Sequence, residues 1–124
     1  PEIVSLEPMT LSDIWSDIQS VADALNDVEA GHRLIDSLQK RLQNLTTTLP
    51  ESTVRPTVVC IEWLEPLMSA GNWIPELVKL AGGTSLLSEA GKHSPWMTWD
   101  DLVSADPDFI VIMPCGFGIA RTKQ

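Results

Sequence analysis

Positive charge, cysteine and long apolar runs are all scarce in this sequence of 124 residues. The chain has 8 lysines and arginines against 17 aspartates and glutamates, which gives a formal net charge of −9. Such a surface repels phosphate backbones and anionic lipid headgroups, so the composition argues against binding to nucleic acid or to a membrane surface. No run of about eighteen apolar residues is present, so the sequence predicts no transmembrane helix.

The two cysteines, Cys60 and Cys115, lack the closely spaced partner ligands that a structural zinc site requires. The sequence therefore predicts no metal site. Each cysteine follows or lies within an apolar run, which favours two buried thiols. A disulfide between them would require that their strands be neighbours.

Common enzyme motifs are missing as well, and we predict no catalytic residue. Residues 116–118 follow a predicted strand and open a predicted helix, as the glycine-rich turn of a dinucleotide-binding domain does. Arg121, however, stands where that motif has its third glycine. Cys115 lies just before this turn, where a helix N-terminus can activate a thiol, but no base accompanies it. A cytoplasmic α/β nucleotide-binding enzyme domain is therefore the alternative from another functional class.

Helical periodicity dominates the first half of the chain. Residues 10–25 place apolar side chains on one face, and Thr10 and Asp13 have the spacing of a capping box. Residues 28–45 predict a longer helix with one apolar stripe and a polar back, which is typical of a strut lying against a neighbour. Pro50 ends this helical region.

Two nearly unbroken apolar runs, residues 57–61 and 109–113, predict strands that are covered on both faces. Between them lie two helical patterns, one capped by Asn72 and the other capped by Thr98. Buried strands that alternate with helices imply a parallel sheet flanked by helices, so the predicted fold class is α/β.

Aromatic side chains gather where an open α/β sheet binds its ligands, beyond the carboxyl ends of the strands. Residues 62–73, which we expect to form a loop, hold two tryptophans, a methionine and two carboxylates. Such residues predict a wall for a large, flat, partly apolar ligand; the alternative is that the aromatics pack back onto the helices. The candidate ligand-binding residues are Trp63, Trp96, Glu62, Glu65, Trp73 and Phe117.

Several segments together resemble one subfamily of the cobalamin-binding, class III periplasmic binding proteins. They are residues 1–8, 61–66, 80–83 and 113–117, and residues 106–108 are typical of the wider ferric-siderophore and cobalamin group. The resemblance covers essentially the whole chain. It implies two α/β lobes joined by one long, rigid helix, with the ligand held between the lobes.

The resemblance also implies how the chain is divided. Residues 1–9 would be the end of a strand of the first lobe, residues 10–50 a helical connector with the inter-lobe spine, and residues 51–124 part of the second lobe. We therefore expect a piece of a longer protein. Its exposed sheet edge would favour a dimer of the piece.

The resemblance also implies roles for individual residues. Trp63 is similar to the family's aromatic that contacts the corrin, and Trp96 to its second-lobe tryptophan. Asp100, with Asp101 beside it, matches the acidic residue that the family offers to arginines of the membrane permease. Both aspartates can be explained equally well without a permease, because acidic side chains stabilise the first turn of a helix.

The resulting hypothesis is a solute-binding component of an ABC importer, not an enzyme and without a cofactor of its own. It would capture a cobalamin-like corrinoid and deliver it to a permease. A ferric-siderophore or haem binding protein is the alternative within the class; Arg121 is the one arginine available to an anionic ligand. The family implies a periplasmic or other extracytoplasmic location, and a cytoplasmic one stays open because the subfamily often lacks an obvious export signal.

Overall fold

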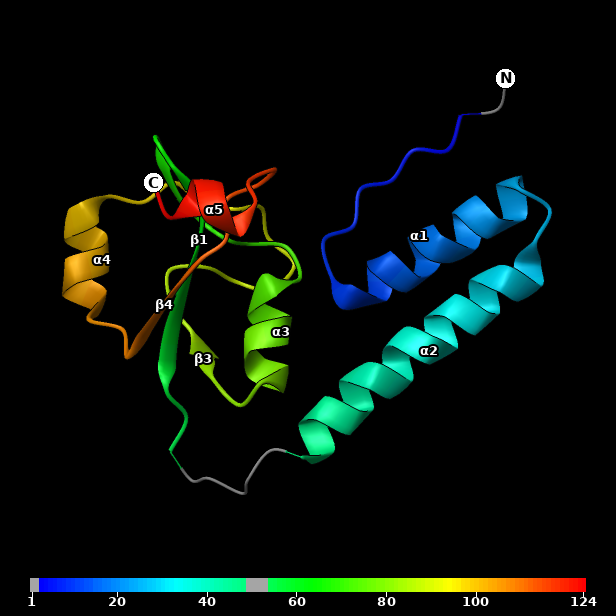
Figure 1. The fold of residues 1–124 in the computed structure, drawn as a ribbon, viewed down its shortest axis with the longest axis horizontal. Coiled ribbons are helices and arrows are strands. Elements are labelled where there is room, and N and C mark those ends of the chain that lie inside the picture. The colour runs from blue at the N-terminus through cyan, green and yellow to red at the C-terminus, as the bar shows by residue number, and fades with distance from the viewer. Residues whose placement is uncertain (1–2, 49–53) are drawn as a thin grey trace.

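The computed structural model describes residues 3–48 and 54–124, in which a helical hairpin precedes an α/β unit (Figure 1). Residues 1–2 and 49–53, which include the predicted helix stop at Pro50, lie outside the described residues. Within them, no helix combines the length and apolar character needed to cross a membrane. The elements are α1 (Leu11–Ala24), α2 (Val28–Thr47), β1 (Thr57–Leu64), β2 (Leu67–Ser69), α3 (Ile74–Leu80), β3 (Thr84–Ser85), α4 (Trp99–Ala105), β4 (Phe109–Ile112) and α5 (Ile119–Thr122).

The predicted capping box begins α1. The amide of Asp13 donates to Thr10 Oγ1 over 3.2 Å, and the amide of Thr10 donates to Asp13 Oδ2 over 2.8 Å. Two amides that the first helical turn cannot satisfy are thus bonded, which fixes where the helix starts. These hydrogen bonds lower the pKa of the Asp13 carboxyl.

Helix α2 packs closely on α1 near their connection and then diverges from it (Figure 1). A Cβ added at Gly31 would lie 2.6 Å from the Cβ of Ala22, so this crossing requires a glycine. Further along α2, Leu45 is 64% exposed. The single apolar stripe therefore lacks a partner over much of its length among the described residues. The role of α2 as an inter-lobe spine stays a prediction.

β1 is the central strand of the described sheet. It pairs in parallel with β4 on one side, and on the other side it pairs in parallel with β3 and antiparallel with β2. The prediction of parallel β1 and β4 is confirmed. The prediction that residues 62–73 form a loop is wrong for their first part, because β1 continues to Leu64 and turns back as β2. The apolar run ends at the polar Glu62, but the strand extends beyond it because β1 continues to pair with β2.

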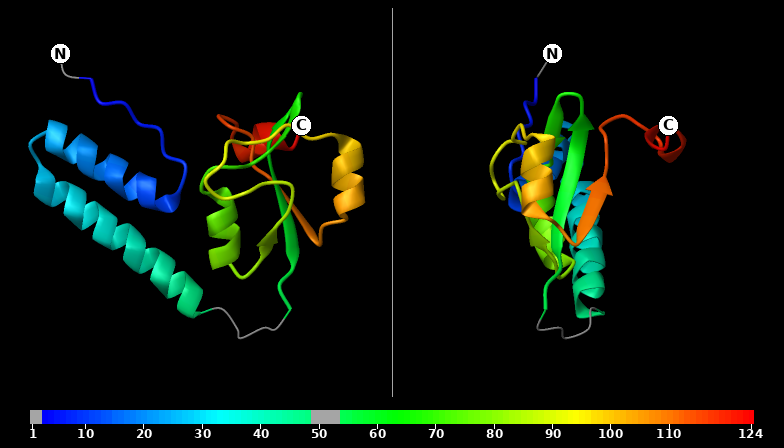
Figure 2. Two further views of the ribbon diagram at one scale, coloured as in Figure 1. Left: turned by 180° about the vertical axis from the view of Figure 1, so that it is seen from behind. Right: turned by 90° about the vertical axis from the view of Figure 1, so that its left-hand side faces the viewer.

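Both faces of β1 are buried, as predicted. Val59 and Ile61 pack with Leu102 of α4, whereas Cys60 packs with Val78 of α3. By contrast, β4 was also predicted to be covered on both faces, and this is wrong for the described residues: all four of its residues are exposed. The reason is its place at the edge of the sheet, where no described element packs over it (Figure 2).

Residues 3–9 form no strand in the structure, where no described strand lies beside them, and their place at the end of a first-lobe strand stays a prediction. Instead, this segment joins the hairpin to the α/β unit. The carbonyl of Pro8 accepts from Asn72 Nδ2 over 3.0 Å, and the amide of Leu11 donates to Glu76 Oε2 over 2.7 Å. Asn72 was predicted to cap α3, which is wrong: the N-cap is Trp73, and the Asn72 side chain is used for the contact with Pro8.

Candidate functional site

Trp63 lies near the carboxyl end of β1, in a row of large side chains. It pairs with Met68 of β2, and Met68 in turn forms a bridge with Trp96. Residues directly opposite each other on neighbouring strands project from the same face, so these three side chains share one face of the sheet. The pairing thus brings together two tryptophans that are 33 positions apart in the sequence (96 minus 63).

Trp96 is held beside β2 by its backbone neighbours. The amide of Ser69 donates to the carbonyl of Pro95 over 3.1 Å, and the amide of Met97 donates to the carbonyl of Leu67 over 3.0 Å. The Trp96 side chain remains 66% exposed. Its backbone is therefore fixed, whereas most of its ring surface is free for contact with a ligand.

Phe117 extends the row from the neighbouring strand. Its ring centroid lies 5.5 Å from that of Trp63, with the planes tilted by 58°. Phe117 follows β4, and the carboxyl ends of parallel neighbours meet at the same edge of a sheet, which explains the contact. We call Trp63, Met68, Trp96 and Phe117 the aromatic wall.

A hollow of about 180 Å³ lies against this wall, lined by Trp63, Leu64, Glu65, Pro114 and Phe117. Sites for small molecules typically enclose roughly 300–1,000 Å³, so this hollow can receive only part of a large ligand. The indole N–H of Trp63 donates to the carbonyl of Glu65 over 2.8 Å. This bond fixes the ring and leaves its π-face for packing.

Arg121 brings a positive charge to the wall. Its guanidinium carbon lies 4.0 Å from the centroid of the Phe117 ring, within the range of a cation–π contact. The side chain is exposed and could also pair with an anionic group of a ligand. The sequence indicated Arg121 only as the one available arginine, and the contact with Phe117 depends on the fold.

Glu62 was predicted to accept hydrogens from a ligand, but both of its carboxylate oxygens have partners within the chain. Oε2 accepts from the hydroxyl of Ser94, and Oε1 accepts from the thiol of Cys115 over 3.8 Å. Glu65 is different: it is exposed and lines the hollow, and its carboxylate has no partner among the described residues. Of the two predicted acceptors, Glu65 is thus the one whose carboxylate has no partner among the described residues, and ligand binding by either stays a prediction.

The two cysteines have different surroundings, so the prediction of two buried thiols is half wrong. Cys60 is 4% exposed within β1, and burial raises its pKa. Cys115 is exposed because it follows the end of β4. Local desolvation, the charge of Glu62 and the hydrogen bond to Glu62 all raise the pKa of the Cys115 thiol. A raised pKa disfavours the thiolate, so an activated nucleophile gains no support.

The remaining candidates lie elsewhere. Trp73 is half-buried at the start of α3 and does not line the hollow. Asp101 caps α4 by accepting from the amide of Thr98 over 2.8 Å and from its hydroxyl over 2.7 Å, which lowers its pKa. The exposed Asp100 has no such partner among the described residues. Asp100 is therefore the better candidate for docking a permease.

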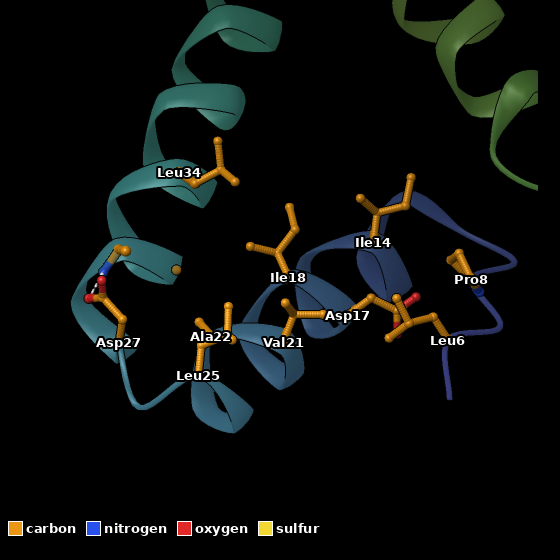
Figure 3. Close-up of a pocket in the computed structure, with 12 residues that line it drawn as sticks. Leu6, Pro8, Ile14, Asp17, Ile18, Val21, Ala22, Leu25, Asp27 and Leu34 are labelled. Atoms are coloured by element: carbon orange, nitrogen blue, oxygen red, sulfur yellow. Dashed lines mark hydrogen bonds between the residues drawn. The ribbon is translucent and has the colours of Figure 1, made fainter. Parts of the chain in front are cut away.

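Among the described residues, no three histidine, cysteine, aspartate or glutamate side chains lie close enough to hold a metal ion. A second cavity, of about 370 Å³, lies between α1, α2 and the segment before α1. Its side chains are mainly apolar, and Asp17 Oδ2 is buried there without a hydrogen-bond partner (Figure 3). The helical stripes predicted two apolar faces but not that the helices would diverge to leave this space.

The α/β unit thus has helices on both faces of β1 and an aromatic wall at the carboxyl edge of its sheet. Residues 3–124 match the model of the periplasmic binding protein family, and the chain belongs to this family. The predicted family and fold class are both confirmed. No curated protein matches the sequence closely enough to indicate a relationship.

Solved structures show the same fold. An ABC transporter substrate-binding protein from Listeria monocytogenes has a TM-score of 0.78 and 20% identity, over 98% of this chain and 48% of that chain. IsdE of S. aureus, complexed with heme, has a TM-score of 0.74 and 21% identity, over 90% of this chain and 44% of its own. The periplasmic vitamin B12 binding protein BtuF of Vibrio cholerae has a TM-score of 0.67 and 21% identity, with 96% and 46% covered. The chain therefore spans about half the length of these structures.

Proposed function

We propose that this chain supplies one wall of the ligand site in the solute-binding component of an ABC importer. The observation that carries the proposal is the aromatic wall, in which side chains from three separate segments meet at the carboxyl edge of the sheet. Membership of the periplasmic binding protein family supports the transport class. The chain binds and delivers a solute in this proposal, and no chemical step is assigned to it.

The ligand we favour is a cobalamin-like corrinoid. Tilted aromatic rings and an adjacent thioether suit a large, flat, partly apolar molecule, because dispersion and apolar burial dominate such contacts. Glu65 at the rim of the hollow can accept hydrogens from amide groups of such a ligand. The fold shared with a vitamin B12 binding protein is compatible with this choice.

Haem or a ferric siderophore is the second candidate, and Arg121 is the observation that favours it. A guanidinium beside the hollow can bind a carboxylate in a bidentate manner, which a corrinoid amide cannot reproduce. One structural relative is complexed with heme. If the ligand is anionic, we expect Arg121→Gln to weaken its binding; if the ligand is a neutral corrinoid, the effect should be small.

The proposed partner is a permease that recognises acidic residues. Asp100 is exposed in the first turn of α4 and is free for this contact, whereas Asp101 is engaged as a cap. Delivery to a permease requires an extracytoplasmic location, which agrees with the family. Loss of uptake by Asp100→Asn, with ligand affinity unchanged, would support this assignment.

The test of the ligand class is equilibrium dialysis of the protein at its full natural length against cyanocobalamin, haemin and a ferric siderophore. Saturable binding of cyanocobalamin at micromolar or lower concentration supports the favoured proposal. Selective binding of either iron ligand supports the second candidate. Binding of none contradicts the transport proposal, and a nucleotide-dependent activity lost on Cys115→Ser but retained in Trp63→Ala would favour the enzyme class.

A further inference from the structure

Glu62 connects the two segments that carry the outer residues of the aromatic wall. Its backbone carbonyl accepts from the amide of Cys115 over 3.3 Å, so the chain beyond β4 stays attached to β1. Its carboxylate then reaches the Cys115 thiol on one side and the Ser94 hydroxyl on the other. Phe117 lies two residues beyond the first contact, and Trp96 lies two residues beyond the second.

The hydrogen bonds around Glu62 have a defined direction. Ser94 Oγ accepts from the amide of Gly71 over 3.0 Å, and it donates its only proton to Glu62. An ionised carboxylate has no proton to give, so it can only accept from Ser94 and Cys115. Glu62 therefore acts as a common acceptor for two segments that share no hydrogen bond with each other among those described.

The packing near Ser94 supports the same interpretation. A Cβ on Gly71 would lie 2.6 Å from the amide nitrogen of Ser94 and from the carbonyl oxygen of Lys92. The segment before Trp96 is thus pressed against the end of β2, with little freedom to move. Ser94 is also bonded to Glu62 of β1. This bond therefore fixes the backbone position of Trp96, two residues later.

We propose that Glu62 is a positioning residue, whose carboxylate aligns the segments carrying Trp96 and Phe117 on either side of Trp63. The inference rests on the proposed function for its effect on ligand binding, while the alignment itself exists without ligand. It replaces the expectation that Glu62 contacts the ligand directly. Pre-ordering the wall in this way reduces the entropy lost when a flat ligand binds.

A double-mutant cycle with Glu62→Gln and Ser94→Ala tests the proposal in the protein at its full natural length, with cyanocobalamin and haemin as probes. We expect each single variant to lower affinity about tenfold, because a hydrogen bond to a charged group is lost. The double variant should lose no more affinity than Glu62→Gln alone, since the bond that Ser94→Ala removes is already weakened in Glu62→Gln, which also weakens the bond to Cys115. Glu29→Gln and Ser104→Ala, at exposed helical positions, are the matched controls and should leave affinity unchanged.

A direct ligand contact by Glu62 predicts a different pattern, which would overturn the proposal. In that case Glu62→Gln weakens binding while Ser94→Ala does not, or the two losses multiply in the double variant. Far-UV circular dichroism checks that each variant folds. The conservative Glu62→Asp variant, which keeps the charge but shortens the reach, should recover little of the affinity if alignment matters.

A measurement without ligand separates this inference from the proposed function. The indole N–H resonance of Trp96 should shift in both Glu62→Gln and Ser94→Ala, and in neither control. Unchanged resonances in the two variants would contradict the positioning role whatever the ligand is. If the wild-type protein binds neither probe but the resonances shift as expected, the positioning role holds and the assigned ligand class is wrong.

Discussion

β1 and β4 are neighbouring strands with similar apolar sequences, but they have opposite surroundings. Ile61 of β1 is 2% exposed, whereas its register partner Ile112 of β4 is 49% exposed. Helices α3 and α4 cover β1 on its two faces, and no described element covers β4. An apolar run therefore predicts a strand more safely than it predicts burial, because burial depends on elements elsewhere in the chain.

The same contrast extends to the site. The β1 side of the aromatic wall is built on a buried strand and a tightly packed turn, whereas the β4 side follows an exposed strand. Trp63 thus belongs to a buried strand and its indole N–H is bonded to the carbonyl of Glu65, whereas Phe117 depends on contacts with Trp63, Arg121 and the segment around Cys115. Three experiments should measure this difference between the two sides. We expect the largest effect from substitutions within β1 and β4, a smaller one from two glycines, and the smallest from the two cysteines.

Alanine substitutions at the register partners Ile61 and Ile112 should give the largest difference in stability between the two strands. In the 124-residue chain, we expect Ile61→Ala to lower the free energy of unfolding by about 3 kcal/mol, because it leaves a cavity in the core. Ile112→Ala should lower it by about 1 kcal/mol or less, since half of that side chain already meets solvent. Urea denaturation followed by circular dichroism measures both values. Equal losses would show that β4 is as buried as β1.

Two glycines next to the site provide a second comparison. A Cβ at Gly71 would clash with backbone atoms at 2.6 Å, so Gly71→Ala should cost about 2 kcal/mol of stability through overpacking. Gly116 has a φ of +74° and open space around it, so Gly116→Ala should cost only the backbone strain, about 1 kcal/mol. Thermal unfolding of both variants measures the difference. A larger loss at Gly116 would contradict the packing described for the two sides.

The smallest expected effect concerns the two thiols. Local desolvation, the charge of Glu62 and the hydrogen bond to Glu62 all raise the pKa of Cys115, so Glu62→Gln, which removes the charge, should lower that pKa and increase the thiolate fraction at a given pH. The pH profile of Cys115 alkylation by iodoacetamide should therefore move to lower pH in the variant. Cys60, buried in β1, should not react in the folded protein. A profile unchanged by the substitution would mean that Glu62 does not act on the thiol.

The sequence predicted well those features that depend on neighbouring residues. Thr10 and Asp13 form the expected capping box, and Thr98 is the expected cap of α4, because the spacing of a few neighbouring residues determines that geometry. The parallel pairing of β1 and β4 followed from alternating strands and helices. The position of Trp63 near the end of β1 was predictable because it comes just after a strong strand signal, and its role in ligand binding stays a prediction.

Features that depend on contacts between distant segments were not predictable in the same way. Pairing through Met68 joins Trp63 to Trp96, and no local pattern marks the bridge between residues 68 and 96. No local pattern indicated that Ser94 and Cys115 would lie beside the carboxylate of Glu62. Asn72 had the chemistry of a helix cap, but a carbonyl 64 residues away competes for its side chain. In each case the residue type allows more than one role, and a contact with a distant segment decides which role the residue takes.

In the proposed site, Trp63 of the buried strand β1 contacts the ligand. Calorimetric titration of the full-length protein with cyanocobalamin, in the wild type, Trp63→Ala and Trp99→Ala, tests it most directly; Trp99 is an exposed tryptophan of α4 outside the aromatic wall. We predict that Trp63→Ala weakens binding by about tenfold or more, as expected for a central aromatic contact, and that Trp99→Ala leaves it unchanged. Wild-type affinity in Trp63→Ala, or equal losses in both variants, would contradict the account.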